Sequence, residues 1–359
     1  MKLLRLMIGS ALVVAAMALA LAALPATQPT RLAARTGPPL QSAKIWGYQL
    51  QSARAELIAP EIDLLVIDHA RDSGTTLLSA RDVDGFRTRA GKPARIVLAY
   101  LSIGEAETYR YYWSKAWVSK AYLGLSRPGW LARENKDWKG NHLVRFWDAD
   151  WQKLIFNPTP SRLDALRHSW FGAPRPYIDL LLEAGFDGVY LDRVDVFGEW
   201  EKTRPTAEAD MAAFVAQLSA YAKARKPGFL IVPQNGEELA ARENYRRSID
   251  GIAKEDLLFG VETAERPNDR DETKRSIELL RKVQTDGKPV FVVEYLTDVK
   301  KRAAARVRMS ELGFTVTFAA RELNNPPEPL PPPAPPPVVP APPPQAPITA
   351  KPAIPRPQP

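Results

Sequence analysis

The sequence predicts an α/β fold, a (β/α)8 barrel of the TIM type, and two observations support this prediction. Short apolar runs alternate with longer amphipathic stretches through the middle of the 359-residue chain, which is the pattern of repeated βα units. Several of these runs end in an acidic residue. No glycine-rich dinucleotide motif or phosphate-binding lysine motif follows any run, which disfavours the alternative of an open, doubly wound sheet.

Eight runs have the length and composition of buried parallel strands. In chain order they are residues 45–50, 64–68, 95–101, 188–192, 229–233, 251–254, 290–294 and 314–318. Helical patterns lie at 175–188, with Gly185 as the expected stop, at 207–228 and at 271–289. Residues 104–170 are too long for one connection and hold most of the tryptophans. They predict an aromatic-rich insertion after the third strand, with an extra short strand at 142–147.

The two ends of the chain differ from the middle. Residues 1–26 begin with Lys2 and Arg5 and continue as an apolar, alanine-rich run, which predicts a cleaved signal peptide, with a retained membrane anchor as the alternative. We expect a linker at 27–42, the barrel domain at 43–325 and a disordered proline-rich tail at 326–359, which could contact the cell wall or a protein. We therefore expect a secreted or periplasmic protein, with anchoring to the membrane as the alternative.

Composition excludes several classes of function. The net charge of +8 is partly carried by the two ends, and no nucleic-acid motif or strongly basic run appears, so no nucleic-acid partner is expected. The absence of cysteine excludes disulfides and thiolate metal sites. His69 follows Asp68, but no metal-binding spacing of histidines is present, so we expect a hydrogen-bonding residue and neither a metal nor a cofactor. The absence of a G-x-S-x-G motif disfavours a serine hydrolase.

Acidic residues recur after the predicted strands. They are Asp68, Glu105, Asp192, Glu237, Glu255 and Glu294. On a barrel these positions share one face. A single such acid is commonly a helix cap, whereas six at one rim indicate chemistry with carboxylates. Glycoside hydrolysis needs two, one as acid/base and one as nucleophile or activator of water. The tryptophans of the insertion are expected mostly to pack it onto the barrel, with one to three reaching a sugar.

Six segments, in order, resemble glycoside hydrolase family 114. They are IWGYQLQ, LLVIDHARD, VLAYLSIGEAE, NHLVRFWDADWQKLIF, YIDLLLEAGFDGVYLDRVD and IDGIAKEDLLF. The resemblance covers roughly residues 43–320 and implies an endo-α-1,4-polygalactosaminidase-like enzyme on a (β/α)8 barrel, acting on an amino-sugar polysaccharide. It implies that Asp192, after strand four, and Glu255, after strand six, are the catalytic pair. It also implies that Asp68, Tyr100, Glu105 and Tyr190 are pocket residues.

The residues and the resemblance lead to one hypothesis with two alternatives. The hypothesis is a secreted glycan hydrolase that retains anomeric configuration, with Asp192 as nucleophile and Glu255 as acid/base. Glu237 and Glu294 are added as substrate-binding candidates because of their strand positions. An acidic cleft would attract the ammonium groups of a galactosamine polymer. The alternatives are a non-catalytic carbohydrate-binding or scaffold barrel, and a metal-dependent hydrolase of another polymer. The segment after Glu255 departs from the family pattern.

Overall fold

The computed structural model describes residues 31–118, 127–157 and 175–329. Within them, eight strands form the wall of a barrel, and all eight predicted strands are confirmed. They are β1 (Trp46–Gln49), β2 (Leu64–Asp68), β5 (Ile96–Ser102), β9 (Gly188–Asp192), β10 (Leu230–Pro233), β11 (Ile252–Glu255), β12 (Val290–Glu294) and β13 (Thr315–Phe318). A further short pair, β3 (Ala70–Arg71) and β4 (Thr76–Leu77), flanks α2 (Asp72–Thr75) beyond the end of β2.

The wall consists of two parallel sheets that meet at two seams. β1, β2, β5, β9 and β10 form one sheet, and β11, β12 and β13 form the other. At the first seam Gln234 bridges Ala253, and the Asn235 N–H donates to the Ala253 carbonyl at 2.9 Å. At the second seam β13 contacts β1, and the Trp46 indole N–H donates to the Thr315 carbonyl at 3.1 Å. The strands therefore follow chain order around a closed (β/α)8 barrel.

Side chains along each strand alternate between the barrel interior and the outer face, because a strand repeats every two residues. The inward residues form one buried cluster, which includes Trp46, Tyr48, Leu64, Val66, Leu98, Tyr190, Val232, Ala253, Phe291 and Val293. The residues between them, such as Leu65, Val97, Val189 and Val292, belong to a separate cluster shared with the helices. This alternation decides which of the strand-end acids can face the barrel mouth.

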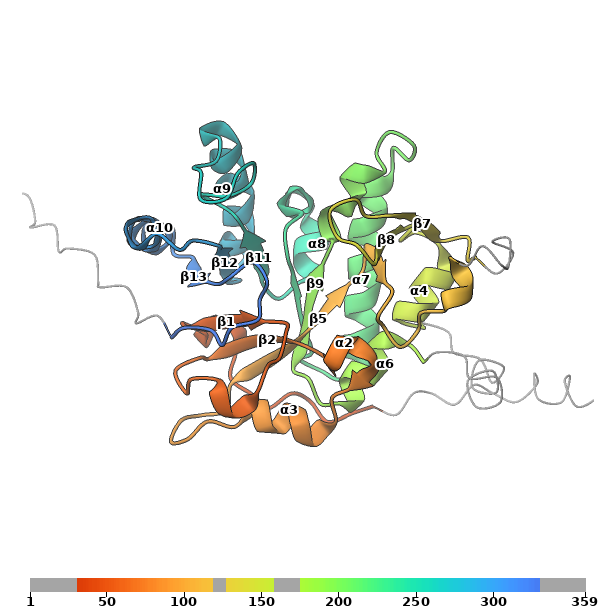
Figure 1. The fold of residues 1–359 in the computed structure, drawn as a ribbon, viewed down its shortest axis with the longest axis horizontal. Coiled ribbons are helices and arrows are strands. Elements are labelled where there is room, and N and C mark those ends of the chain that lie inside the picture. Colours follow the sequence, from red (N-terminus) through yellow and green to blue (C-terminus); the bar gives the residue numbers. More distant parts are fainter. Residues whose placement is uncertain (1–30, 119–126, 158–174, 330–359) are drawn as a thin grey trace, which may run out of the picture.

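Helices cover the outer face of the barrel (Figure 1). They are α3 (Ala80–Arg87), α6 (Tyr177–Glu183), α7 (Ala207–Arg225), α8 (Glu243–Ser248), α9 (Arg270–Thr285) and α10 (Val299–Leu312). The three predicted helical stretches are confirmed. Past the end of α6, Gly185 has φ 82°, a left-handed conformation that glycine adopts without steric cost. Asp269 caps the N-terminus of α9, and its side chain accepts the N–H groups of Asp271 and Glu272.

The predicted insertion lies between β5 and α6. It contains a three-stranded antiparallel sheet of β6 (Glu105–Glu107), β8 (Asn141–Val144) and β7 (Leu131–Glu134), followed by α4 (Ala149–Ile155). β8 is the expected extra strand. Figure 1 shows β7, β8 and α4 on the opposite side of the molecule from α9 and α10. Most tryptophans pack on one another as expected, in the pairs Trp113–Trp117, Trp117–Trp130 and Trp130–Trp151. Trp170 lies outside the described residues.

Both ends of the described chain pack on the barrel. The N–H groups of Leu32 and Arg35 donate to the carbonyls of Arg225 and Pro227. Leu40 is 2% exposed and joins the interior cluster, so residues 31–42, expected to be linker, contact the domain. The expected leader at 1–26 and residues 330–359 of the expected tail lie outside the described part. None of the helices in the described ranges has both the length and the apolar character needed to span a bilayer.

Candidate active site

Asp192 and Glu255 lie at the carboxyl ends of β9 and β11 and face the barrel interior. Tyr190 and Ala253, two residues before them, belong to the interior cluster, so the strand period points both carboxyls inward. Both side chains are partly buried. Burial, and then the charge of Glu255, raise the pKa of Asp192.

Asp192 accepts three hydrogen bonds. The Tyr100 hydroxyl donates to Oδ2 at 2.6 Å, the Arg193 backbone N–H to Oδ1 at 2.7 Å, and the Gln234 side-chain amide to Oδ1 at 3.4 Å. Burial, and then the charge of Glu255, raise the pKa of Asp192 to about 7, while the Tyr100 hydrogen bond acts in the opposite direction. The Asp192 carboxyl can therefore change its protonation state near neutral pH.

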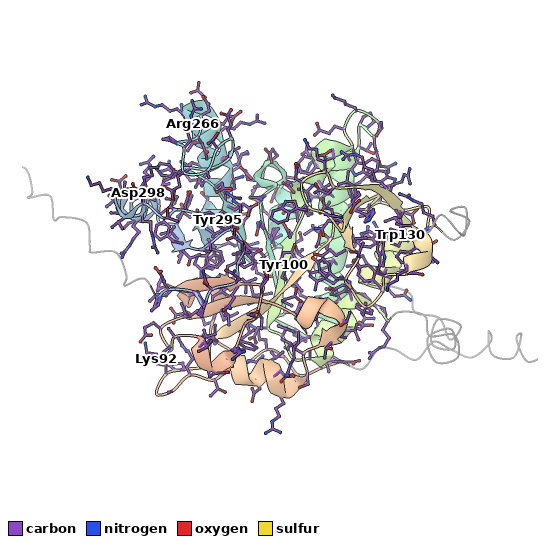
Figure 2. All side chains as sticks on the ribbon, in the orientation of Figure 1. Lys92, Tyr100, Trp130, Arg266, Tyr295 and Asp298 are labelled. Atoms are coloured by element: carbon purple, nitrogen blue, oxygen red, sulfur yellow. The ribbon has the colours of Figure 1, made fainter. Side chains whose placement is uncertain are left out.

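Glu255 is held by donors from the strands on both sides. Asn235, after β10, donates to Oε1 at 3.2 Å and also accepts the Glu255 backbone N–H at 3.2 Å. Tyr295, after β12, donates its hydroxyl to Oε2 at 3.0 Å. Burial, and then the charge of Asp256, raise the pKa of Glu255, against the effect of these two hydrogen bonds. Figure 2 labels Tyr100 and Tyr295, which support Asp192 and Glu255 respectively.

The other acids around the mouth differ from this pair because most have a cationic partner. The ion pairs are Asp68–Arg110 at 2.8 Å, Glu105–Arg193 at 3.0 Å, Glu237–Lys254 at 3.2 Å and Asp256–Arg321 at 2.8 Å. Within the described ranges, no cationic side chain lies within 4.0 Å of the carboxyl oxygens of Asp192 or Glu255. These two carboxyls thus have no cation within that distance to hold them in the ionised form.

Tyr100 and Tyr190 also point inward. Tyr100 contacts Asp192 directly. The Tyr190 ring centroid lies 5.1 Å from that of Tyr48, and its buried hydroxyl has no hydrogen-bond partner among the described residues. A buried polar atom without a partner is costly. The Tyr190 hydroxyl is therefore an unsatisfied polar group inside the barrel, two residues before Asp192 on β9.

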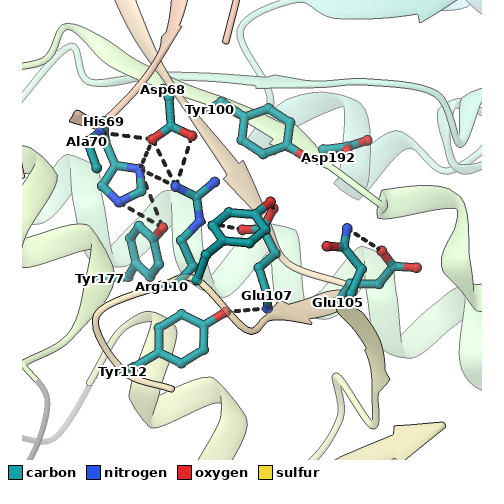
Figure 3. A network of polar contacts seen from close by, with 12 residues as sticks. Asp68, His69, Ala70, Tyr100, Glu105, Glu107, Arg110, Tyr112, Tyr177 and Asp192 are labelled. Atoms are coloured by element: carbon teal, nitrogen blue, oxygen red, sulfur yellow. Dashed lines mark hydrogen bonds and ion pairs between the residues drawn. The ribbon is translucent and has the colours of Figure 1, made fainter. Parts of the chain in front are cut away.

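Asp68 belongs to a buried polar network next to Tyr100 (Figure 3). The Arg110 guanidinium donates to both Asp68 oxygens, at 2.8 and 2.9 Å, and to Glu107 at 2.5 Å. His69 is hydrogen-bonded to the Tyr177 hydroxyl at 2.9 Å. Burial, and then the charge of Arg110, lower the pKa of His69 to about 3, so its ring is neutral. No cluster of three or more potential metal ligands occurs in the ranges that the structure covers.

The structure encloses the remaining three predicted site residues in protein. Glu105 is 0% exposed and accepts the side-chain amides of Asn135 at 2.8 Å and Asn141 at 3.2 Å. Glu237 accepts the Ser276 hydroxyl from α9 at 2.5 Å. Glu294 follows the inward-facing Val293 and so points outward, where it accepts the Leu258 N–H at 2.8 Å. Contact of these three carboxylates with a substrate stays a prediction.

Sequence reasoning missed Gln234, Asn235 and Tyr295, which contact the two carboxyls. A signal for them existed. Gln234 and Tyr295 lie two residues beyond the inward-facing Val232 and Val293, so the strand period would have placed their side chains at the mouth. Asn235 has φ 58°, a left-handed conformation that asparagine tolerates better than most residues. The Asn235-Gly236 dipeptide is a sequence signal for that conformation, because Asn-Gly favours turns with positive φ, and Gly236 has φ 61°.

A closed (β/α)8 barrel with two inward-facing carboxyls at its C-terminal mouth fits an enzyme that works by carboxylate chemistry, as glycoside hydrolases do. The chain matches the model of glycoside-hydrolase family GH114 over residues 26–328. It therefore belongs to this family and is a glycoside hydrolase, as the resemblance of its motifs predicted.

The chain is also similar to two uncharacterized proteins and to one solved structure. An uncharacterized protein of Deinococcus radiodurans is 33% identical over 281 residues, covering 77% of this chain and 80% of the relative. One of Methanocaldococcus jannaschii is 35% identical over 269 residues, covering 72% and 68%. The glycoside hydrolase domain of PelA from Pseudomonas aeruginosa superposes with a TM-score of 0.56 at 18% identity, covering 80% of this chain and 98% of that domain. It has the same fold.

Proposed function

We propose that the protein is a secreted or periplasmic hydrolase that cleaves α-1,4-linked galactosamine-type polysaccharide with retention of configuration. The observation that carries this proposal is the pair Asp192 and Glu255, which face the barrel interior, interact electrostatically and lack a cationic partner in the described structure. The choice of an amino-sugar polymer rests on the family resemblance of the motifs. The expected leader at residues 1–26 supports export.

In the proposed mechanism Asp192 is the nucleophile and Glu255 the acid/base. An Asp192 oxygen forms a bond to the anomeric carbon while the bond from that carbon to the leaving oxygen breaks, and Glu255 gives its proton to the leaving oxygen. Water then attacks the anomeric carbon, Glu255 takes the proton of that water, and Asp192 is released. Three hydrogen-bond donors stabilise the ionised Asp192, and the raised pKa of Glu255 favours its protonated form.

The proposal is tested with the purified full chain and a partly N-acetylated α-1,4-galactosamine polymer, with new reducing ends as the readout. Glu255→Gln should lower kcat/KM by about 10²–10⁴-fold, and Asp192→Asn should abolish turnover. Asp84→Asn is the matched control, because Asp84 is an exposed carboxylate on α3, outside the barrel. Proton NMR of the first product identifies its anomer, and the retained α-anomer is expected.

Other results would support the alternatives. Binding of the polymer by the wild-type chain without new reducing ends would favour a non-catalytic carbohydrate-binding barrel. Loss of turnover on chelation, with recovery on adding a divalent metal, would favour a metal-dependent hydrolase. Full activity of Asp192→Asn on the polymer would overturn the assignment of the pair.

A further inference from the structure

The connection between β7 and β8, residues 135–140, exposes a large aromatic side chain. Trp138 is 58% exposed, more than any other aromatic residue that the structure describes. Burial of a large apolar side chain typically stabilises a folded protein, and Trp138 forgoes this stabilisation. The other tryptophans described in the insertion pack on aromatic neighbours. The exposure of Trp138 therefore calls for a different explanation from packing.

The backbone that carries Trp138 is held in place by hydrogen bonds. The Asn135 side-chain oxygen accepts the N–H groups of Asp137 at 2.9 Å and Trp138 at 3.3 Å. The Trp138 carbonyl accepts the Asn141 N–H at 3.1 Å. The Glu134 carboxylate accepts the Gly140 N–H at 2.7 Å. An exposed ring on a fixed backbone loses little conformational freedom when a ligand stacks on it.

The same turn is connected to Asp192 through few residues. The side chains of Asn135 and Asn141 donate to the buried Glu105, and Glu105 pairs with Arg193 at 3.0 Å. Arg193 follows Asp192 and donates its N–H to the Asp192 carboxylate. The turn that holds Trp138 is therefore fixed to the barrel mouth beside β9.

A second exposed ring lies between the turn and the mouth. The Gly140 carbonyl accepts the Thr108 N–H at 2.9 Å, which brings the turn next to Tyr109, whose side chain is partly exposed. The Arg110 guanidinium lies 4.9 Å from the centroid of the Tyr109 ring and 5.9 Å from that of Tyr100. Tyr109 thus follows a residue that is hydrogen-bonded to the turn, and its ring shares the Arg110 guanidinium with Tyr100, which contacts Asp192.

We propose that Trp138 is a sugar-stacking platform that binds the polysaccharide at a distance from the catalytic pair. This inference rests on the proposed function and deepens it. The flat apolar face of an indole fits the apolar face of a pyranose ring.

The charge of the turn specifies which sugar units the platform binds. Lys136 and Lys139 flank Trp138, and Glu134 and Asp137 offset their charges, so residues 134–140 carry no net charge. Such a turn offers an ammonium group no net attraction, so the platform takes N-acetylated, uncharged units.

Binding is measured by titration calorimetry with the full chain carrying Asp192→Asn, so that the ligand is not consumed. The probes are long and short fully N-acetylated α-1,4-galactosamine oligosaccharides. Adding Trp138→Ala should weaken binding of the long oligosaccharide about tenfold and leave the short one unchanged. Trp138→Phe should recover most of the affinity. Leu57→Ala, which removes an exposed apolar side chain far from β7 and β8 in the chain, is the control and should change nothing.

Each other outcome bears on the proposal. Equal affinity of the Trp138→Ala variant for the long oligosaccharide would overturn it. Tighter Trp138-dependent binding of the deacetylated polymer than of the N-acetylated one would overturn the selection for uncharged units. If the wild-type chain cleaves the polymer but Trp138 has no effect on binding, the platform fails and the proposed function stands. If Trp138→Ala weakens binding but the wild-type chain cleaves nothing, the platform stands and the proposed function fails.

Discussion

Asp192 lies between donors that stabilise its charge and a neighbouring carboxyl that opposes it. The Tyr100 hydroxyl lowers the pKa of Asp192, while burial and Glu255 raise it. The balance between these effects determines at which pH Asp192 is ionised. The proposed nucleophile Asp192 must be ionised and the proposed acid Glu255 must be protonated. The acidic limb of the kcat/KM profile against pH should therefore report on Asp192, and the alkaline limb on Glu255.

Tyr100→Phe removes the donor without changing the shape of the ring. The pKa of Asp192 should rise, so the acidic limb of the kcat/KM profile should move to higher pH while the alkaline limb stays in place. Tyr48→Phe is the control, because the Tyr48 ring is also in the interior, whereas the hydroxyl that donates to Asp192 is that of Tyr100. A shift of the alkaline limb alone would show that Asp192 is the acid and reverse the roles.

The raised pKa of Asp192 also predicts a cost in stability. The folded pKa of about 7 lies above the usual value for aspartate. Folding therefore disfavours the ionised form, and stability decreases as pH rises from about 4 to 7. Asp192→Asn removes this cost and should raise Tm at pH 8 by about 2 °C or more. The increase should be much smaller at about pH 3, below the ordinary aspartate pKa, where wild-type Asp192 is mostly protonated in both states. An equal change at both pH values would contradict this account.

At the scale of single strands, alternation separates acids that face the mouth from acids that support the outer layer. On β11, Glu255 points inward and Lys254 lies next to Glu237 outside. On β12, Glu294 points outward and fixes the Leu258 N–H. All of these residues follow apolar runs in the sequence. A position at the carboxyl end of a strand therefore places an acid at the C-terminal end of the barrel. It does not by itself show whether the side chain points into the barrel or toward the helices.

Glu294→Gln tests the outward position. Burial raises the pKa of Glu294 to about 8, so the side chain is neutral at pH 7, and glutamine keeps the oxygen that accepts the Leu258 N–H. Activity and Tm should be unchanged at pH 7. Glu294→Ala leaves that N–H without a partner and should cost about 1–3 kcal/mol of unfolding free energy, as measured by urea denaturation. A large loss of kcat/KM in Glu294→Gln with normal stability would instead support the predicted substrate contact.

At the scale of the whole molecule, residues before the first strand take part in the core. Leu40 packs in the interior cluster, near Gly251 at the start of β11. Leu40→Ala should lower the free energy of unfolding by about 2–5 kcal/mol. Leu57→Ala, at an exposed position, should change it by less than about 0.5 kcal/mol. If urea denaturation showed that Leu40→Ala and Leu57→Ala lower the free energy of unfolding equally little, residues 31–42 would be a linker, as the sequence suggested.

The sequence predicted the barrel well because each strand is a local apolar run bounded by turn residues. The partners of charged residues could not be predicted in the same way, since they are far apart in the chain. Arg321 pairs with Asp256, and Asn135 with Glu105. These pairings distinguish Asp192 and Glu255 from the other acids, so the special status of the pair emerged only with the fold. Counting strands, together with the family resemblance, nevertheless identified both residues.

The seam between β10 and β11 has a consequence for how heat inactivates the protein. Asp192 belongs to the five-stranded sheet and Glu255 to the three-stranded sheet, and across this seam the structure shows a single bridge with a few backbone hydrogen bonds. We expect separation at the seam to require less free energy than disruption of either sheet, because fewer backbone hydrogen bonds cross it. Separation would break the Asn235–Glu255 hydrogen bonds and change the spacing of the two carboxyls, on which glycosidase chemistry depends. On this account we expect heat to abolish activity by a local event before the barrel melts.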